Sequence, residues 1–209
     1  EGNFYLGEKV VIDKFNVALV GAGAFYALGG TDPGFPQTGG TILHVDDTFT
    51  DTYAIECKPT NPSVRSLVGC RLEGFAIDGY DTPSFANTSG IYWQVFRGTI
   101  ENVGISRLQD DGLVVDGNDA TVTYPLGAWD NRIHDLTVVG VSRDCVQFTN
   151  GASDCVLTAS KFTHETSGVS GRYGVYSDQS PGLQIVGCHF YYIKDYAIYS
   201  NARQLQVGA

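Results

Sequence analysis

Two short motifs recur along the chain in a fixed order, and this cycle constrains the fold more than any other feature of the sequence. The first motif is a small residue followed by an apolar residue, a variable residue and an apolar or small residue. Its copies start at Gly90, Gly112, Cys145, Gly174 and Ala197. Apolar residues at alternate positions are typical of a β-strand with one buried face and not of a helix.

The second motif places apolar or small residues at a first position and again three and five positions later. Its copies start at Leu72, Ile100, Ile133, Leu157, Ile185 and Val207. The starts lie roughly 22 to 33 residues apart, which is within the range of periods seen in solenoid repeats. Strands cannot change length without losing register, but turns can take insertions. The unequal spacing therefore predicts loops of different length on otherwise equivalent circuits.

The cycle predicts an all-β chain, a right-handed single-stranded parallel β-helix (a solenoid) with loop insertions. Adjacent rungs of such a fold lie ~4.8 Å apart along the axis, so equivalent residues of successive circuits form ladders. A β-sandwich would have strands of similar spacing, but it would not need an ordered cycle of two motifs. We expect parallel, in-register stacking of strands at 90–94, 112–116, 145–149, 174–178 and 197–201.

The regular cycle covers residues 68–209, and we expect residues 1–67 to form less regular circuits of the same continuous domain. The sequence contains no Met and begins at Glu1 without a charged and apolar leader, so we expect a segment of a longer chain. Early strands are expected at Phe15 to Gly23, Thr41 to Val45 and Tyr53 to Cys57, with a Gly-, Pro- and Thr-rich excursion at Gly29 to Gly40.

The composition narrows the classes of partner. With 43% hydrophobic and 17% charged residues, the chain can form a core and is not expected to be disordered. A net charge of −10 argues against binding the phosphates of a nucleic acid, and no apolar run is long enough for membrane insertion. The spacing of Cys and His predicts no metal site and no cofactor. The five cysteines are expected to be free thiols, with Cys145 and Cys188 facing inward.

The residues just before the first motif are the candidates for catalysis. Asp110 and Asp111 precede one copy and Asp144 precedes the next, so Asp111 and Asp144 are expected at one edge, one or two strand spacings apart. Two carboxyl groups this close raise each other's pKa, and a glycosidase uses such a pair as acid and base or nucleophile. Asp is also common in turns, where it accepts hydrogen bonds from backbone amides. A structural role therefore stays open, with Arg143 forming a charge ladder with Asp110 and Asp111.

Outward-facing tyrosines give a separate signal for carbohydrate binding. Sugar rings pack on aromatic rings while their hydroxyls contact polar neighbours. The alternative is a tyrosine ladder that stabilises the sheet or lies at a subunit contact. The expected sugar-binding residues are Tyr173, Tyr176, Tyr196 and Tyr199 on two adjacent circuits, with Arg143 and Arg172 beside them and Trp129 as a platform on the 118–130 insertion.

The stretches Gln109-Asp110-Asp111-Gly112-Leu113 and Arg143-Asp144-Cys145-Val146 resemble the pectate-lyase-like β-helix superfamily. Its polygalacturonase-type glycosidases carry an Asp before Gly on one circuit and an Asp before Cys on the next. The resemblance implies that Asp111 and Asp144 occupy these two positions. The chain also departs from that pattern. Arg143 stands where the glycosidases have another carboxylate, Arg172-Tyr173-Gly174 stands where they have Gly-His-Gly, and their Arg-Ile-Lys motif is missing.

The stretch Asn16 to Gly23, which reads Asn-Val-x-Leu-x-Gly-x-Gly, and the large loops resemble phage tailspikes and tail fibres with this fold. This resemblance implies a homotrimer in the phage tail or otherwise outside the cell, and a segment that binds a host-surface polysaccharide. Two alternatives remain open. One is a polysaccharide-degrading enzyme, a glycoside hydrolase or lyase that uses Asp111 and Asp144. The other is an inert stalk.

Overall fold

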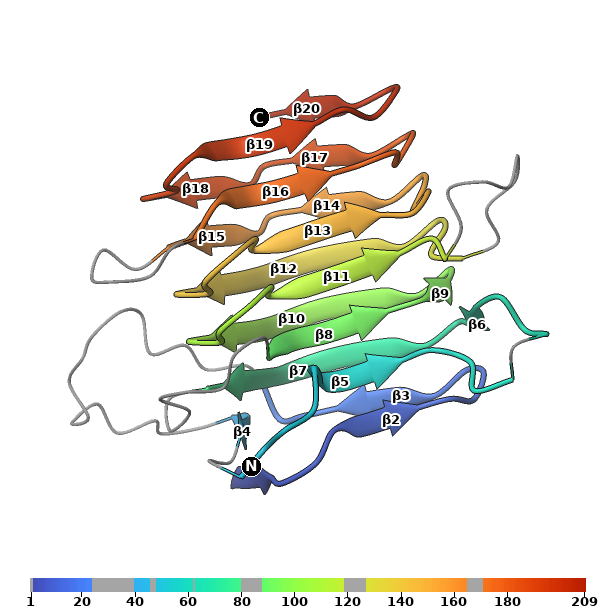
Figure 1. Ribbon diagram of the computed structural model, residues 1–209, viewed down its shortest axis with the longest axis vertical. Helices are drawn as coiled ribbons and strands as arrows, with labels where there is room; N and C mark the ends of the chain where they lie inside the picture. The colour runs from blue at the N-terminus through green and yellow to red at the C-terminus, as the bar shows by residue number, and fades with distance from the viewer. Residues whose placement is uncertain are drawn as a thin grey trace.

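The computed structural model describes residues 2–23, 40–45, 48–61, 63–79, 88–118, 127–164 and 171–209. This part of the chain is all β and contains no helix. It forms two long sheets of parallel strands, sheet A and sheet B, and a separate two-stranded pair. Figure 1 shows the strands stacked one above another along the long axis, with the N-terminus at the bottom and the C-terminus at the top. Among these residues, none belongs to a helix that could cross a membrane.

The strands of each sheet are not consecutive in the chain, because the chain alternates between the sheets. Sheet A contains β1 (Gly2–Leu6), β3 (Ala18–Val20), β4 (Thr41–Val45), β7 (Arg71–Asp78), β10 (Thr99–Ser106), β12 (Arg132–Val139), β14 (Val156–Thr158), β15 (Lys161–Thr163), β17 (Gln184–Val186), β18 (His189–Tyr191) and β20 (Gln206–Gly208). Sheet B contains β2 (Val10–Ile12), β5 (Tyr53–Cys57), β8 (Ser89–Trp93), β11 (Leu113–Asp116), β13 (Val146–Thr149), β16 (Tyr173–Ser177) and β19 (Tyr196–Ser200). The pair consists of β6 (Leu67–Val68) and β9 (Val95–Phe96).

The predicted parallel stacking is confirmed in register. One ladder in sheet B joins Ile91, Leu113, Val146, Val175 and Ile198 on successive circuits. Its counterpart in sheet A joins Leu72, Ile100, Ile133, Leu157, Ile185 and Val207. Apart from Val207, which is 61% exposed, side chains from both ladders meet in one apolar core. The two motifs found in the sequence are therefore the inward-facing positions of sheet B and sheet A.

A left-handed residue two positions into the second motif explains its uneven spacing. In an unbroken strand every second side chain would point inward. In this motif the side chains of the first and fourth residues point inward instead. The third residue of the motif has a positive φ in the five copies that start before Val207, at Gly74, Asn102, Asp135, Ala159 and Gly187. This conformation bends the strand and brings the fourth residue back to the core. Gly, Asn and Asp adopt it most readily, but Ala159 adopts it too, with a φ of 51°.

A buried asparagine fixes the corner that follows sheet B. Asn131 accepts hydrogen bonds from Trp93 Nε1 at 3.0 Å and from the backbone N–H of Gly98 at 2.8 Å. Its own amide donates to the carbonyl of Val95 at 2.7 Å. All three groups are inside the protein, where an unpaired polar atom would cost about 1–3 kcal/mol. The side chain therefore ties two circuits together at the end of β8.

The N-terminal region contains more strands than expected. The strands at Thr41–Val45 and Tyr53–Cys57 are confirmed as β4 and β5, while β1 and β2 were not predicted. Strands β3 and β4 both pair with β7, β3 along its first half and β4 along its second. They are thus two halves of one rung, and the Gly-rich excursion departs between them. Most of that excursion, and of the predicted insertions 79–89 and 118–130, lies outside the described residues.

The five cysteines are all free. Cys57, Cys70, Cys145 and Cys155 are buried, and Cys188 is half-buried and packs against the core. Burial raises the pKa of the Cys155 thiol to about 11, so this thiol stays protonated and acts as a small apolar side chain.

Candidate functional site

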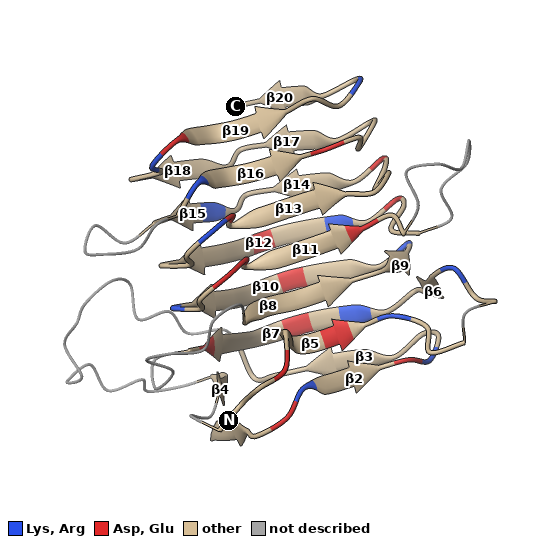
Figure 2. Ribbon diagram, viewed as in Figure 1, with Lys and Arg blue, Asp and Glu red and all other residues tan. Residues whose placement is uncertain are grey.

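The turns that lead into sheet B stack one on the next and place the charged candidates in columns. The backbone N–H of Arg143 donates to the carbonyl of Asp110 at 3.2 Å, and that of Arg172 donates to the carbonyl of Arg143 at 2.8 Å. Asp195 continues the column with a bond of 3.0 Å to Arg172. Figure 2 shows these acidic and basic segments at the start of β11, β13, β16 and β19. Asp110, Arg143, Arg172 and Asp195 therefore form one column along the edge of sheet B.

Each candidate carboxylate is bound by an arginine or by the backbone. Arg143 Nη1 lies 2.9 Å from Asp110 Oδ1, and Arg143 Nη2 lies 3.4 Å from Asp111 Oδ2. This is the charge ladder that the sequence suggested as the alternative. Asp111 Oδ1 accepts the backbone N–H of Asp144 at 3.0 Å. Arg172 Nη2 donates to Asp144 Oδ2 at 2.7 Å. We call these five residues, Asp110, Asp111, Arg143, Asp144 and Arg172, the acidic edge.

Burial dominates the protonation of the acidic edge. Asp111 is 2% exposed and Asp144 is 0% exposed. Burial, followed by the charge of Asp110, raises the pKa of Asp111 to about 7. Burial also raises the pKa of Asp144, against the hydrogen bond from Arg172. A carboxyl that keeps its proton near neutral pH has the chemistry of a general acid.

The same burial removes these carboxyl groups from a substrate. A general acid must come within hydrogen-bond reach of the oxygen that it protonates, and neither carboxyl presents a solvent-accessible face in this conformation. The hydrogen bonds close turns between successive circuits. Catalysis by Asp110, Asp111 and Asp144 stays a prediction, and it requires the acidic edge to open.

Four tyrosines on β16 and β19 form a stacked group, which we call the tyrosine array (Tyr173, Tyr176, Tyr196 and Tyr199). The rings of Tyr176 and Tyr199 are nearly parallel, 3° apart, with centroids 5.5 Å from each other. The ring of Tyr173 lies 5.1 Å from that of Tyr199 and 6.1 Å from that of Tyr196. Tyr196 is 61% exposed and Tyr199 40%. The structure therefore brings all four predicted tyrosines together at the surface.

Arg172 joins the acidic edge to the tyrosine array. Its guanidinium carbon lies 5.2 Å from the ring centre of Tyr173 and 5.9 Å from that of Tyr176, within cation–π range. The same guanidinium binds Asp144. On the far side of the array, Asn201 Nδ2 donates to Asp178 Oδ1 at 2.6 Å. The array thus has one arginine and two carboxylates around it.

Trp129, the predicted sugar platform, lies at the other end of sheet B. It follows the C-terminal end of β11, where the backbone N–H of Ala128 donates to the carbonyl of Asp116. Its ring packs 5.8 Å from that of Phe96, and its Nε1 donates to Asp154. Asp111 precedes the same strand. Trp129 is therefore separated from the acidic edge by the length of β11.

A second polar network on the outer face of sheet B was not predicted. Glu56, Tyr92, Gln147, Tyr176 and Tyr199 share one outward ladder, which also contains Val114. At its lower end Glu56 binds two lysines, Lys9 Nζ at 2.8 Å and Lys58 Nζ at 2.5 Å. The Tyr92 hydroxyl donates to Asp116 Oδ2 at 2.6 Å. The strand register could have revealed this network, since Glu56 occupies the position of Tyr176 four circuits earlier.

A cysteine and a histidine lie close together in the interior. Cys145 Sγ lies 3.6 Å from His164 Nε2, but burial raises the pKa of the thiol and lowers that of the imidazole, so the pair is neutral and not a nucleophile with its base. Within the described ranges, no cluster of three or more His, Cys, Asp or Glu side chains could hold a metal ion.

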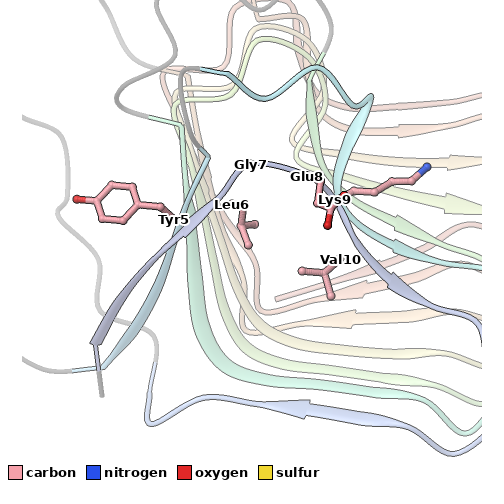
Figure 3. A pocket seen from close by; sticks show the side chains of 6 residues that line it. All are labelled: Tyr5, Leu6, Gly7, Glu8, Lys9 and Val10. Carbon is pink, nitrogen blue, oxygen red and sulfur yellow. The ribbon is translucent and has the colours of Figure 1, made fainter.

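Two surface hollows that are lined by described residues lie away from both groups. Figure 3 shows one at the N-terminal end of the stack, where Leu6 and Val10 point inward and Tyr5 points away. Leu6 and Val10 pack against the core, so this hollow is the open end of the interior. Another is lined by Ser63, Arg65, Ser66 and Phe96. Neither contacts the acidic edge or the tyrosine array.

No family model and no curated protein matches the sequence. A solved structure that is similar to this chain is ORF18 of Geobacillus virus E2, with a TM-score of 0.50 and 14% identity over 98% of this chain. This chain spans about half, 49%, of the length of that protein. At this identity the likeness concerns the fold, and it places the parallel-sheet architecture of this chain beside that of a phage protein.

Proposed function

We propose that the chain is a segment of a phage tail fibre or tailspike, folded as a right-handed parallel β-helix, that binds a host-surface polysaccharide through the outer face of sheet B. Long parallel sheets in register and a similar fold in a phage protein support the architecture. Under this proposal the protein is part of the virion, and tailspikes of this kind act as trimers.

The observation that carries the proposal is the exposed tyrosine array beside polar side chains. Aromatic rings accept the C–H faces of sugars, and neighbouring polar groups bind the hydroxyls. Tyr196 and Tyr199 are the exposed members, and Arg172, Asp178 and Asn201 supply donors and acceptors nearby. Such a combination of aromatic surface and a few fixed polar groups is typical of small-ligand sites.

The stacking of the rings limits how a sugar can bind. Tyr173 and Tyr176 present one ring face to the rings of β19, so those faces are covered. The outer faces of Tyr196 and Tyr199 and the hydroxyl edges of the array remain for a ligand. We therefore assign the main stacking contact to Tyr196 and Tyr199.

An enzyme that cuts polysaccharide is the second candidate. The raised pKa of Asp111 favours it, because a protonated carboxyl near pH 7 is a general acid. The burial of Asp111 and Asp144 and their pairing with Arg143 and Arg172 oppose it. An inert stalk is the third candidate, in which the array only stabilises the sheet.

Binding to immobilised bacterial surface glycans tests the proposal. Tyr199→Ala should weaken binding by about tenfold or more, with the melting temperature unchanged. Tyr191→Ala is the matched control, since Tyr191 lies on the same circuit and is 51% exposed but is outside the array. Release of reducing ends that is lost in Asp144→Asn would favour the enzyme. Equal effects of the two tyrosine variants would refute the array as the site.

A further inference from the structure

The charges around the tyrosine array do not favour an anion. Arg172 contacts the array, and its Nη2 is already bound to Asp144. Burial, followed by the charge of Asp178, raises the pKa of the Tyr176 phenol, and Asp144 adds to the effect while Arg172 opposes it. A ligand at Tyr176 and Tyr199 thus lies near two carboxylates, Asp178 and the buried Asp144, and near one arginine whose charge is compensated.

The ion pair at the edge of the array carries an unused donor and an unused acceptor. Asp144 and Arg172 meet through a single contact, Nη2 to Oδ2. Asp144 Oδ1 and Arg172 Nε are both buried and have no hydrogen-bond partner among the described residues. Buried polar atoms are normally paired with protein or with water. Their burial closes both atoms off from a ligand, whereas the Arg172 side chain as a whole is 41% exposed and can donate to the hydroxyl groups of a sugar.

The cations further along the face of sheet B are compensated in the same way. Lys9 and Lys58 both bind Glu56, and Arg143 binds Asp110 and Asp111. The net charge of −10 adds a long-range repulsion for polyanions. These lysines and arginines are thus already paired with carboxylates of the protein. Recognition of uronic or sialic acids would need a cation that is free to pair with the carboxylate of the sugar.

We infer that the glycan of this site is uncharged, and that the exposed part of the Arg172 guanidinium binds its hydroxyl groups at the edge of the tyrosine array. This inference rests on the proposed function and names the substrate class of that site. Arg172 is a hydroxyl-binding residue in this account and not an anchor for a carboxylate.

Two sets of probes test the inference. The neutral set is oligosaccharides of mannan, galactan and glucan, and the anionic set is oligogalacturonate and sialylated oligosaccharides. Both are titrated at low (~0.02 M) and high (~0.5 M) salt. We expect at least one neutral probe to bind, with an affinity that changes less than about twofold with salt, and no binding of the anionic probes at low salt. Anionic binding that weakens steeply with salt would overturn the inference while leaving the proposed function intact. No binding of any probe would overturn both.

Variants separate hydroxyl recognition from simple charge. Arg172→Lys keeps the charge but removes the planar guanidinium, and we expect it to weaken neutral binding by about tenfold with an unchanged melting temperature. Asp178→Asn removes a negative charge next to the array and should allow oligogalacturonate to bind. Asp116→Asn is its control, because it removes the same charge from sheet B at a distance from the array. An Arg172→Lys protein that binds the neutral probe like the original would refute the role of Arg172.

Discussion

The carboxylate of Asp111 accepts a hydrogen bond from the backbone N–H of Asp144, at 3.0 Å. The two residues that the sequence suggested as a catalytic pair are thus joined through the backbone of one and the side chain of the other. Arg143 and Arg172 complete the contacts on the outer side. The hydrogen bonds and ion pairs of the acidic edge therefore connect successive circuits next to the tyrosine array.

The protonation of Asp111 should make stability depend on pH. Its pKa is raised from 3.8 to about 7 on folding, so the folded protein keeps a proton that the unfolded chain loses. This stabilisation is fully present below about pH 4 and is lost as the pH rises through about 7, with a slope of at most about 1.4 kcal/mol per pH unit. Asp111→Asn should remove this dependence in urea unfolding. Leu113→Ala, as a control, should lower stability equally at both ends of the range. A pH profile of Asp111→Asn identical to that of the original chain would contradict the assignment.

Asp78 should make stability change with pH in the opposite direction. Burial alone would raise the pKa of Asp78, but hydrogen bonds from His44 and Arg107 outweigh it and lower that pKa below 3.8. The paired carboxylate therefore stabilises the fold above about pH 4, and this contribution is lost as the pH falls through the lowered pKa. Asp78→Asn should cost about 3 kcal/mol near pH 7 and much less near pH 2. A cost that is the same at both pH values would show that the ion pairs do not stabilise the fold.

Replacing Ala159 by glycine should raise the stability of the fold. A non-glycine residue in the left-handed region costs roughly 1–2 kcal/mol, and Ala159 has a φ of 51°. Ala159→Gly should therefore raise the free energy of unfolding by about 1 kcal/mol, since the gain exceeds the entropic cost of glycine. Ala152→Gly is the matched control, because Ala152 is outside the set of residues with positive φ and should lose about 0.5–1 kcal/mol. The same sign of change at both sites would contradict this explanation of the corner.

Truncating a side chain of the apolar ladders should lower the free energy of unfolding in proportion to the burial of that side chain. Leu113 lies in the middle of sheet B and is 0% exposed, so Leu113→Ala should cost about 2–5 kcal/mol by leaving a cavity. Ile198 occupies the same ladder on the last circuit but is only half-buried. Ile198→Ala should cost clearly less. Denaturant unfolding of both variants measures the difference, and equal losses would argue against a core centred on the middle circuits.

The ladders could be predicted from the sequence because alternate apolar residues repeat with each circuit. Leu113 aligns with Val146 and Leu72 with Ile100, as the register of the motifs requires. The bends could not be predicted. Asn102 and Asp135 carry a local preference for the left-handed region, but Ala159 and Arg97, which also adopt it, carry none.

The candidate site could be predicted from the sequence where the contacts depend on the strand register alone. Equivalent positions on adjacent circuits brought Tyr176 to Tyr199 and Arg143 to Asp110. What register cannot give is the direction and burial of each side chain. Asp144 turned out to be buried. Trp129 lies beyond the opposite end of β11, and the length of the insertion alone did not reveal where the chain returns to the stack.

The most direct test of the central claim is to follow the tyrosine rings by NMR while a bacterial surface polysaccharide that the protein binds is added. The account predicts that the ring signals of Tyr196 and Tyr199 shift first and in parallel with saturation, that those of Tyr173 and Tyr176 follow, and that Tyr5 and Tyr53 do not respond. Unchanged signals from the tyrosine array, with shifts at the acidic edge or elsewhere on the stack, would contradict the claim that this array is the glycan site.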